Sequence, residues 1–430
     1  MIVNTADEGG GAERMSMAVL DGFAELGLET WLLVGNKKTD HPRVVPLYLS
    51  PFIDYRPYQA EPRQTLLATR RRAERWLGLE DFNHPYSHRI LDLTGSAPDL
   101  VLCHNLHGGY FDLRALPVLS RRVPVALRLF DPWLLIGHRA DALADLRRPT
   151  GCDTSPGLKQ PPAITRINSW RKRRVLRGAR LFASAESQWM LDHARKSLLA
   201  PMVSDWRLIP GGVDLDAFSP GPQAAAREEL GLDPGARIVL FVANLGPENP
   251  LKDFATVRRA MVELGRRAPE KRIELLAVGS DGPEERIAPG IVLRRLGYIR
   301  SVARLVNFYR AANVYVHAAV NETFGLSVAE ALACGTPVVA ASSGGVLEII
   351  DNGRTAVAVP PGDAAALAGA IESVLDNPSL GAAMGAAAVA SARANLDRRT
   401  MMRALHAWCA GIHAAWTSGG ASKAGVRVGL

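Results

Sequence analysis

The sequence contains little cysteine and no long apolar run. Its 430 residues include four cysteines that lie far apart and form no CxxC pair, namely Cys103, Cys152, Cys334 and Cys409. This spacing indicates neither a disulfide framework nor a zinc site. No window approaches the roughly 18 apolar residues of a membrane-spanning helix, and the start MIVNTADEGG lacks the basic and apolar stretches of a secretory or transit segment. We therefore expect a reduced, cytoplasmic, enzyme-like chain.

The composition is that of an ordinary globular protein with a basic surplus. Hydrophobic residues make up 47% and charged residues 22% of a chain long enough for two or three domains. The net charge of +8 favours an anionic partner. Nucleic acid, an acidic membrane face and a phosphorylated lipid acceptor are all anionic, and the net charge alone does not distinguish between them.

The stretch AANVYVHAAVNETFGLSVAEALACGTPVVAA organises the rest of the chain. Residues 314–316 form a β-branched and aromatic run that predicts a buried parallel strand. A loop at 318–325 leads into an Ala- and Leu-rich helix at 326–334. A glycine and a proline at 335–337 end this helix, and the next strand follows at 338–341. The pattern predicts one βαβ unit.

Two carboxylates frame the start of the predicted helix. Glu322 lies in the preceding loop and Glu330 lies about one turn inside the helix. The backbone amides of Phe324, Gly325 and Leu326 lie between them, and an exposed helix N-terminus with a glycine suits a phosphate. Because carboxylates accept hydrogen bonds from sugar hydroxyls, the arrangement indicates a nucleotide sugar. The alternative is an acidic helix start that only complements the helix dipole.

This segment resembles the signature of the family 4 retaining glycosyltransferases, in which two glutamates are separated by seven residues. The resemblance implies an α/β protein of GT-B fold, with two doubly wound Rossmann-like domains that face a central cleft. It also implies that Glu322 contacts the transferred sugar and Glu330 the nucleotide ribose. The donor would be a UDP- or GDP-linked sugar, and neither a metal nor another cofactor is expected.

The N-terminal end predicts a second unit of strand, glycine loop, helix and strand. The loop covers residues 5–11, a helix with apolar residues at three-four spacing follows to residue 26, and a strand covers 30–34. GGGAER resembles the loop that faces the donor diphosphate in this family. The resemblance therefore assigns Gly10 and Gly11 to the donor side, whereas a simple turn is the alternative.

The sequence predicts a buried strand at 98–104, and HNLHGGYF continues from its carboxyl end. This segment resembles the corresponding one in a subgroup of the family whose members build polysaccharides. His104 and His107 would orient acceptor hydroxyls or act as acid or base, or else only pack. The next strand, at 123–129, leads to Phe130, where relatives commonly have a histidine near the reacting centre. Asp131 is the nearest polar substitute, and His138 is another acceptor-side candidate.

Two basic segments, at 63–78 and 166–180, allow several interpretations. The second carries seven basic residues and no acidic one. A helix on an anionic membrane, or one that holds an acceptor phosphate, is our preferred functional interpretation. A solvated charged face and nucleic-acid binding are the alternatives. We expect no nucleic acid partner, and we expect residues 180–184 to form the last strand of this half.

Residues 206–220 resemble the family's inter-domain connection. Asp214 and Asp216 form a DxD pattern there, which we interpret as turn chemistry and not as a metal site. Further on, Lys252 matches the lysine with which relatives hold the diphosphate. Asn244 stands where relatives have an arginine, so one charge of the usual pair is missing.

Other positions complete the donor side. Arg300 is a candidate to replace the missing arginine charge. Tyr298 follows a predicted strand at 292–296, in a segment that borders the nucleobase in relatives. The resemblance therefore implies that Tyr298 stacks on the base, and a place in the core is the alternative.

We expect an acceptor-side domain at 1–210, a nucleotide-sugar-binding domain at 211–398, a helix at 399–417 that crosses back, and a tail at 418–430. The expected activity is transfer of a sugar, with retention, to an acceptor hydroxyl on a carbohydrate, lipid-linked or small molecule. Glu322, Lys252 and Asp131 are the expected catalytic residues. A non-catalytic nucleotide-sugar binder, a nucleic-acid binder, and an epimerase or phosphorylase of the same fold are alternatives.

Overall fold

The computed structural model describes residues 1–47, 73–74, 76–80, 82–137 and 162–418. The chain forms two compact units. The first unit comprises Met1–Ala185, Leu191–Ile209 and Met402–Leu430, and the second comprises Glu186–Met190 and Pro210–Met401. Of the helices in the described ranges, none is both long and apolar enough to cross a membrane.

The first unit is built on a seven-stranded parallel sheet of order β3-β2-β1-β4-β5-β6-β7. Its inner strands are almost entirely buried, as expected for a parallel sheet with helices on both faces. The strands are β1 (Ile2–Ala6), β2 (Leu32–Asn36), β3 (Val44–Pro46), β4 (Val101–Cys103), β5 (Val125–Leu129), β6 (Leu181–Ala185) and β7 (Val203–Leu208).

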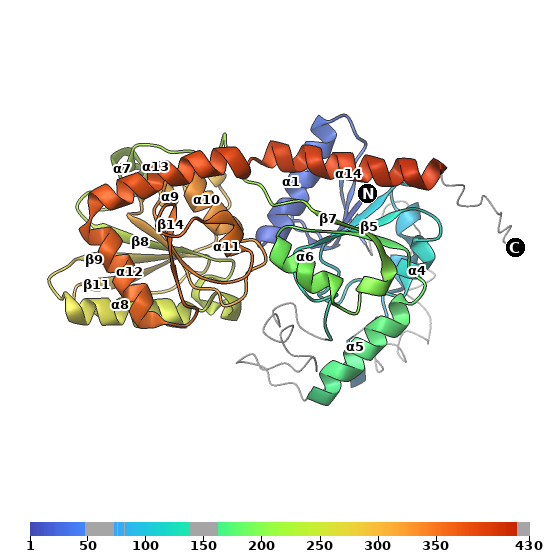
Figure 1. The fold of residues 1–430 in the computed structure, drawn as a ribbon, viewed down its shortest axis with the longest axis horizontal. Helices are drawn as coiled ribbons and strands as arrows, with labels where there is room; N and C mark the ends of the chain where they lie inside the picture. The colour runs from blue at the N-terminus through green and yellow to red at the C-terminus, as the bar shows by residue number, and fades with distance from the viewer. Residues whose placement is uncertain (48–72, 75, 81, 138–161, 419–430) are drawn as a thin grey trace, which may run out of the picture. The chain divides into compact units, whose positions relative to one another are not determined.

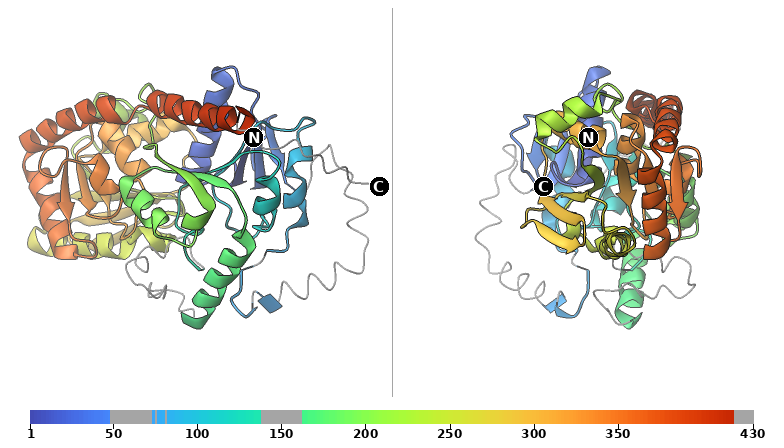
Figure 2. Two further views of the ribbon diagram at one scale, coloured as in Figure 1. Left: turned by 45° about the vertical axis from the view of Figure 1, so that its right-hand side comes forward. Right: turned by 90° about the vertical axis from the view of Figure 1, so that its left-hand side faces the viewer.

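Helices from both ends of the chain pack together in the first unit. α1 and α14 lie side by side (Figures 1 and 2), and a Cβ added to Gly22 of α1 would meet Met402 of α14 at 2.6 Å. Trp408 of α14 donates from Nε1 to Asp205 of β7 at 2.9 Å. The helices that lie wholly or mostly in this unit are α1 (Gly11–Glu25), α4 (Ala115–Leu119), α5 (Pro162–Leu176), α6 (Gln188–Arg195) and α14 (Arg398–Ser418).

The second unit contains a seven-stranded sheet of order β10-β11-β9-β8-β12-β13-β14. All its neighbouring strands are parallel except β10 and β11, which are antiparallel. The strands are β8 (Arg237–Val242), β9 (Ile273–Val278), β10 (Glu285–Ala288), β11 (Ile291–Leu296), β12 (Val314–His317), β13 (Val338–Ala341) and β14 (Ala356–Val359).

Both faces of the second sheet are covered by helices. Ile238 and Leu240 of β8 enter one core cluster, with residues of α9, α10 and α13. Val239 and Phe241 enter another, with residues of α8 and α12, which lie next to each other in Figure 1. The helices are α7 (Gln223–Leu230), α8 (Phe254–Arg267), α9 (Val302–Ala311), α10 (Leu326–Cys334), α11 (Val346–Ile349), α12 (Ala364–Asp376) and α13 (Pro378–Asn395).

The expected α/β class with two doubly wound Rossmann-like domains is confirmed. Helix 326–334 and strand 338–341 have the predicted bounds. Two expectations were wrong. The loop expected from residue 5 begins only after β1, and residues 180–184 are not the last strand of the first half, because β7 follows. β7 was not predicted because half of the residues in VSDWRL are polar and, at this edge of the sheet, none of the strand is buried, so it lacks the buried apolar run of an inner parallel strand.

Candidate functional site

Each sheet has one point at which the order of the strands reverses. In the first unit this point lies between β1 and β4, and in the second between β8 and β12. The loops that leave neighbouring strands diverge there, so ligands of open α/β sheets bind beyond the carboxyl ends of these strands. Functional side chains are therefore expected in the loops after β8 and β12 and in those after β1 and β4.

In the second unit, two predicted catalytic residues meet at this point. Lys252 ends a short turn after β8, and Glu322 lies in the loop after β12. Nζ of Lys252 donates to Oε2 of Glu322, and the glutamate side chain is 13% exposed. The two residues are 70 positions apart in the sequence, and adjacent strands bring them together.

His317 is a site residue that the sequence analysis missed. It is the last residue of β12, is 3% exposed, and its Nε2 lies 3.2 Å from Oε2 of Glu322. Within the described part of the chain, no partner reaches its Nδ1. A histidine at the carboxyl end of a predicted buried strand was the available signal, since functional groups collect at that end.

The charges of this cluster are strongly perturbed. Burial by itself would raise the pKa of Glu322, but the ammonium of Lys252 and the hydrogen bond from His317 outweigh it and hold the pKa well below its usual range. Burial lowers the pKa of His317, more than Glu322 raises it. At neutral pH Glu322 is therefore ionised, and a neutral His317 donates its Nε2–H to it.

The start of α10 lies beside Glu322 and has no side-chain cap. Its N-cap, Gly325, has φ +93° and makes no side-chain capping bond. The first amides of a helix have no carbonyl partner within the helix, so they form an anion site when nothing caps them. A second glycine, Gly344 with φ +53°, packs under the same loop, and a Cβ added there would lie 2.0 Å from the carbonyl oxygen of Glu322.

The remaining donor-side candidates occupy different environments. Glu330 is 2% exposed, and its Oε2 accepts from the hydroxyl of Tyr309 at 2.8 Å. The ring of Phe324 is buried, so only its backbone can serve a ligand. Tyr298 follows β11 and is 39% exposed, which places it outside the core. Asn244 is exposed in the loop after β8.

The first unit has its own charged pair at the point of reversal. Nε2 of His107, in the loop after β4, lies 3.2 Å from Oδ2 of Asp131, which follows β5. Burial alone would lower the pKa of His107, but the charge and hydrogen bond of Asp131 raise it. Gly10 is the N-cap of α1 and makes no side-chain capping bond, and Gly11 begins the helix. The predicted acceptor-side residues His107 and Asp131 are thus in contact.

His104 lies in the interior of the first unit. Ser16 Oγ donates to the carbonyl of Ala12, so it accepts from Nδ1 of His104 at 2.6 Å. The other ring nitrogen, Nε2, is buried and meets no partner among the residues that the structure describes. Burial, followed by the charge of Arg128, lowers the pKa of His104 well below its usual range. Its ring packs edge-on against Phe130 at 4.9 Å. His138 lies outside the described residues.

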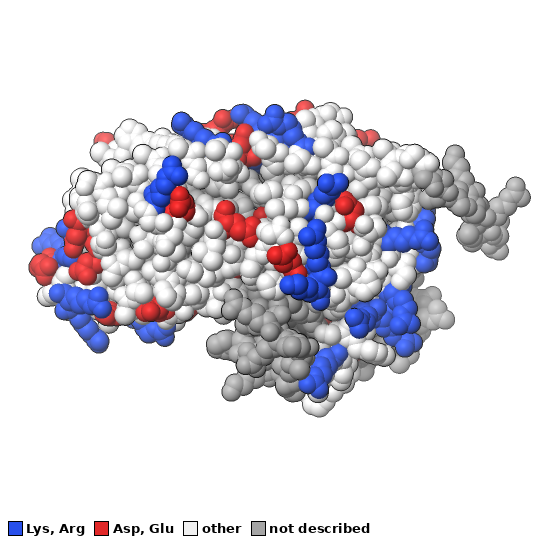
Figure 3. Space-filling model, in the orientation of Figure 1, with Lys and Arg blue, Asp and Glu red and all other residues white. Residues whose placement is uncertain are grey.

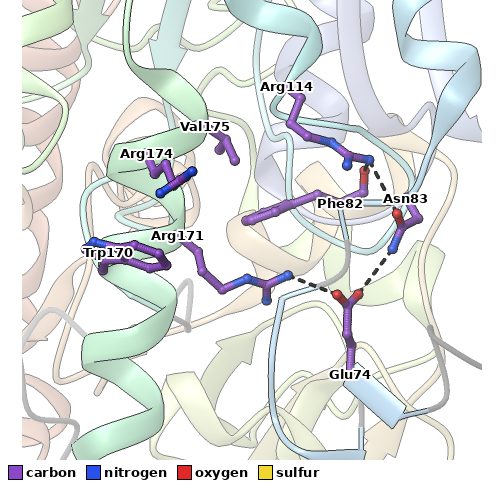
Figure 4. A pocket seen from close by; sticks show the side chains of 8 residues that line it. All are labelled: Glu74, Phe82, Asn83, Arg114, Trp170, Arg171, Arg174 and Val175. Carbon is purple, nitrogen blue, oxygen red and sulfur yellow. Dashed lines mark hydrogen bonds and ion pairs between the residues drawn. The ribbon is translucent and has the colours of Figure 1, made fainter.

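The basic segment 166–180 forms much of α5, and only part of it is available to a partner. Figure 3 shows blue side chains over this region, and Arg166, Arg173 and Arg174 are exposed. Lys172 instead is fully buried, and its Nζ donates to the carbonyl of Trp133 at 2.7 Å. Arg171 pairs with Glu74 at 3.2 Å on the wall of a cavity of about 200 Å³ (Figure 4). The other basic segment, 63–78, lies mostly outside the described residues.

The DxD pattern is engaged in local structure. Asp214 Oδ1 accepts from the backbone N–H of Asp216 at 3.1 Å, and its Oδ2 pairs with Arg398 at 2.9 Å. Asp216 pairs with Arg399. Over the ranges that the structure describes, no group of three or more His, Cys, Asp or Glu side chains is arranged to hold a metal ion.

Two doubly wound units of this kind define the GT-B fold, and solved structures of that fold match nearly the whole chain. Sucrose-phosphate synthase from Thermosynechococcus elongatus matches with a TM-score of 0.65 and 20% identity over 96% of this chain and 98% of that one. Anabaena HepE in complex with UDP-glucose matches with a TM-score of 0.65 and 16% identity over 95% and 98%. These likenesses show the fold.

The sequence shows the family. A family model described as "Glycosyl transferases group 1" matches residues 222–390. The D-inositol 3-phosphate glycosyltransferase of Kribbella flavida is 31% identical over 301 residues, and the match covers 66% of this chain and 68% of the relative. The D-inositol 3-phosphate glycosyltransferase 2 of Catenulispora acidiphila is 40% identical over 180 residues, and the match spans 39% of this chain and 42% of that relative's length. The chain belongs to the group 1 glycosyltransferases.

Proposed function

We propose that this chain is a family 4 retaining glycosyltransferase that moves a sugar from a nucleotide diphosphate donor to an acceptor hydroxyl. The observation that supports this most strongly is the meeting of Lys252 and Glu322 beside the uncapped start of α10. Uncapped helix amides suit a phosphate, and an ionised carboxylate accepts hydrogen bonds from sugar hydroxyls. Glu330, inside α10, would hold the ribose, as in the family that the sequence resembles.

In the proposed reaction, the bond between the anomeric carbon and the phosphate oxygen breaks while the acceptor oxygen bonds to the same face of that carbon. The acceptor proton moves to the departing phosphate, so no enzyme nucleophile is needed. The ammonium of Lys252 has three N–H donors. It therefore can keep its bond to Glu322 and also donate to the leaving diphosphate, whose charge it neutralises. No metal takes part in this proposal.

The first unit would supply the acceptor side. A pair such as His107 and Asp131 can orient a hydroxyl and exchange a proton with it. Several relatives are named D-inositol 3-phosphate glycosyltransferases, so a phosphorylated cyclic polyol is our first acceptor probe. Carbohydrate and lipid-linked acceptors, in polysaccharide or glycolipid synthesis, are the next. We place the reaction in the cytoplasm, with α5 as the surface for any contact with an anionic membrane.

The test is incubation of radiolabelled UDP-glucose, UDP-N-acetylglucosamine and GDP-mannose with the wild type and with Glu322→Gln. We expect the wild type to hydrolyse or transfer at least one sugar, and Glu322→Gln to bind that donor with much slower turnover. The anomeric configuration of the product, read by NMR, tests retention. Binding without hydrolysis or transfer would favour the non-catalytic alternative, for which Asn244 and Phe130 are the motivation. No binding at all would refute the proposed function.

A further inference from the structure

The two contacts of the Glu322 carboxylate fall on one oxygen. Oε2 accepts from Nζ of Lys252 and also from Nε2 of His317 at 3.2 Å. No donor within the described ranges reaches the second oxygen, Oε1, and 13% of the side chain is exposed. One oxygen of this carboxylate is therefore held by the protein, and the other is available to a ligand.

The two groups that hold Oε2 differ in what they can do when an anion arrives. Lys252 carries a compact ammonium on a flexible stem, with three donors that can turn toward a phosphate. His317 is a rigid ring at the end of a buried strand, and its Nε2–H can donate in one direction only. When Lys252 donates to a diphosphate as well as to Glu322, its flexible stem can shift, whereas the bond from the rigid ring of His317 keeps the orientation of Glu322.

We propose that His317 is a positioning residue for the donor sugar: its Nε2–H holds Oε2 of Glu322 so that Oε1 accepts hydrogen from the transferred sugar. This inference rests on the proposed function and adds the residue that orients Glu322 toward the sugar. An anionic oxygen accepts only from a group that carries hydrogen. The sugar therefore presents a hydroxyl or an amide N–H at this point, and not a carboxylate.

Three variants separate this role from simple packing. In His317→Gln, the longer amide side chain can bring an N–H to the place of Nε2 and keep the bond to Glu322. In His317→Asn, the amide reaches only the place of Nδ1 and loses that bond. His317→Leu has no donor. The asparagine and glutamine variants bury the same chemical group at one position, so they form a matched pair.

The experiment measures kcat and KM of each variant with the labelled donors, and titrates each variant with UDP-glucose and GDP-mannose and with the sugar-free UDP and GDP. We expect His317→Gln to stay close to the wild type. We expect His317→Asn and His317→Leu to lose about 10²-fold in kcat, since a small misplacement of a positioning group costs this much. Their affinity for UDP and GDP should not change, because those ligands lack the sugar.

A purely structural role predicts another result. It would lower the melting temperature and weaken UDP and UDP-glucose equally in all three variants. That outcome, or wild-type kinetics in His317→Asn and His317→Leu, would overturn the inference and leave the proposed function intact.

The hydrogen bond itself can be tested without a donor substrate. In a ¹⁵N spectrum of the imidazole nitrogens, compared with that of His317→Gln, we expect a protonated Nε2 and an unprotonated Nδ1 at neutral pH. The opposite tautomer would overturn the inference. Failure of every nucleotide sugar to bind the wild type would instead contradict the proposed function.

Discussion

The reversal points of the two sheets are built alike, and they differ in what their histidines contact. His104 follows β4 and His317 ends β12, and each is 3% exposed and kept neutral by burial. Each has one ring nitrogen that meets no partner in the described ranges of the chain. In the first unit the other nitrogen contacts a serine, whereas in the second it contacts a charged glutamate.

The charged pairs at the two reversal points also differ, and each pair suits a different kind of chemistry. Lys252 and Glu322 are a cation and an anion beside uncapped amides, which suits a phosphorylated sugar. His107 and Asp131 form an imidazole–carboxylate pair, which suits proton exchange with a hydroxyl. The fold supplies the position, and the residues at the strand ends supply the chemistry.

The largest effect is expected from Lys252→Met. It should lower kcat/KM with the active donor by about 10²–10³-fold, because in the proposed reaction it removes the cation that neutralises the leaving group. Lys271→Met is the matched control in the same unit, since Lys271 also pairs with carboxylates, Glu372 at 2.9 Å and Asp376 at 2.7 Å. If the two variants had equal kinetics, the pair of Lys252 and Glu322 would have no more effect on the reaction than a structural ion pair.

Gly344→Ala tests the backbone that carries Glu322. A methyl group there cannot lie 2.0 Å from the carbonyl of Glu322, so the loop must move. Gly353→Ala is the control, because Gly353 has φ +81° but nothing within 4 Å of an added Cβ. Both variants should lose about 1 kcal/mol from the positive φ, and Gly344→Ala at least about 2 kcal/mol more from the clash. Denaturant unfolding measures the difference, and equal losses would contradict it.

A pH profile of stability tests the buried lysine of the first unit. Burial lowers the pKa of Lys172 to about 8, against 10.5 in an unfolded chain, although Glu80 opposes the shift. Between these pH values Lys172 is protonated in the unfolded state and largely unprotonated in the folded state. Its contribution to the free energy of unfolding therefore rises by about 3 kcal/mol as the pH increases through this range. Lys172→Met should lack this gain, whereas Lys196→Met, at an exposed lysine, should keep it. If the stability of the wild type and that of Lys172→Met changed with pH in parallel, Lys172 would not titrate with a pKa lowered by burial.

The smallest effect concerns His107. Because Asp131 raises its pKa, the pair stabilises the fold fully below the ordinary histidine value of about 6.5 and loses this contribution as the pH rises through the raised pKa. The stability difference between wild type and His107→Gln should be about 1 kcal/mol or less at acidic pH and should shrink at alkaline pH. In an Asp131→Asn background the trend should reverse, because burial then lowers the pKa of His107. Persistence of the wild-type trend in that background would assign it to another group.

Local chemistry decided which parts of the sequence were predictable. Helix 326–334 and strand 338–341 were predicted with their exact bounds because a glycine and a proline separate them. The contact between Lys252 and Glu322 could not be predicted, since it depends on β8 and β12 being neighbours. The end of a buried strand could have marked His317 as a candidate, but the direction of its ring toward Glu322, five residues later, depends on the fold of the intervening loop.

The central claim is that the donor binds at the start of α10 in the second unit. Hydrogen–deuterium exchange of the chain, with and without whichever of UDP-glucose and GDP-mannose binds, tests it most directly. We predict slower exchange for the amides of residues 324–328, because they donate to the diphosphate, and unchanged exchange in α13. Unchanged exchange at 324–328 with saturating donor, together with protection elsewhere in the chain, would contradict the account.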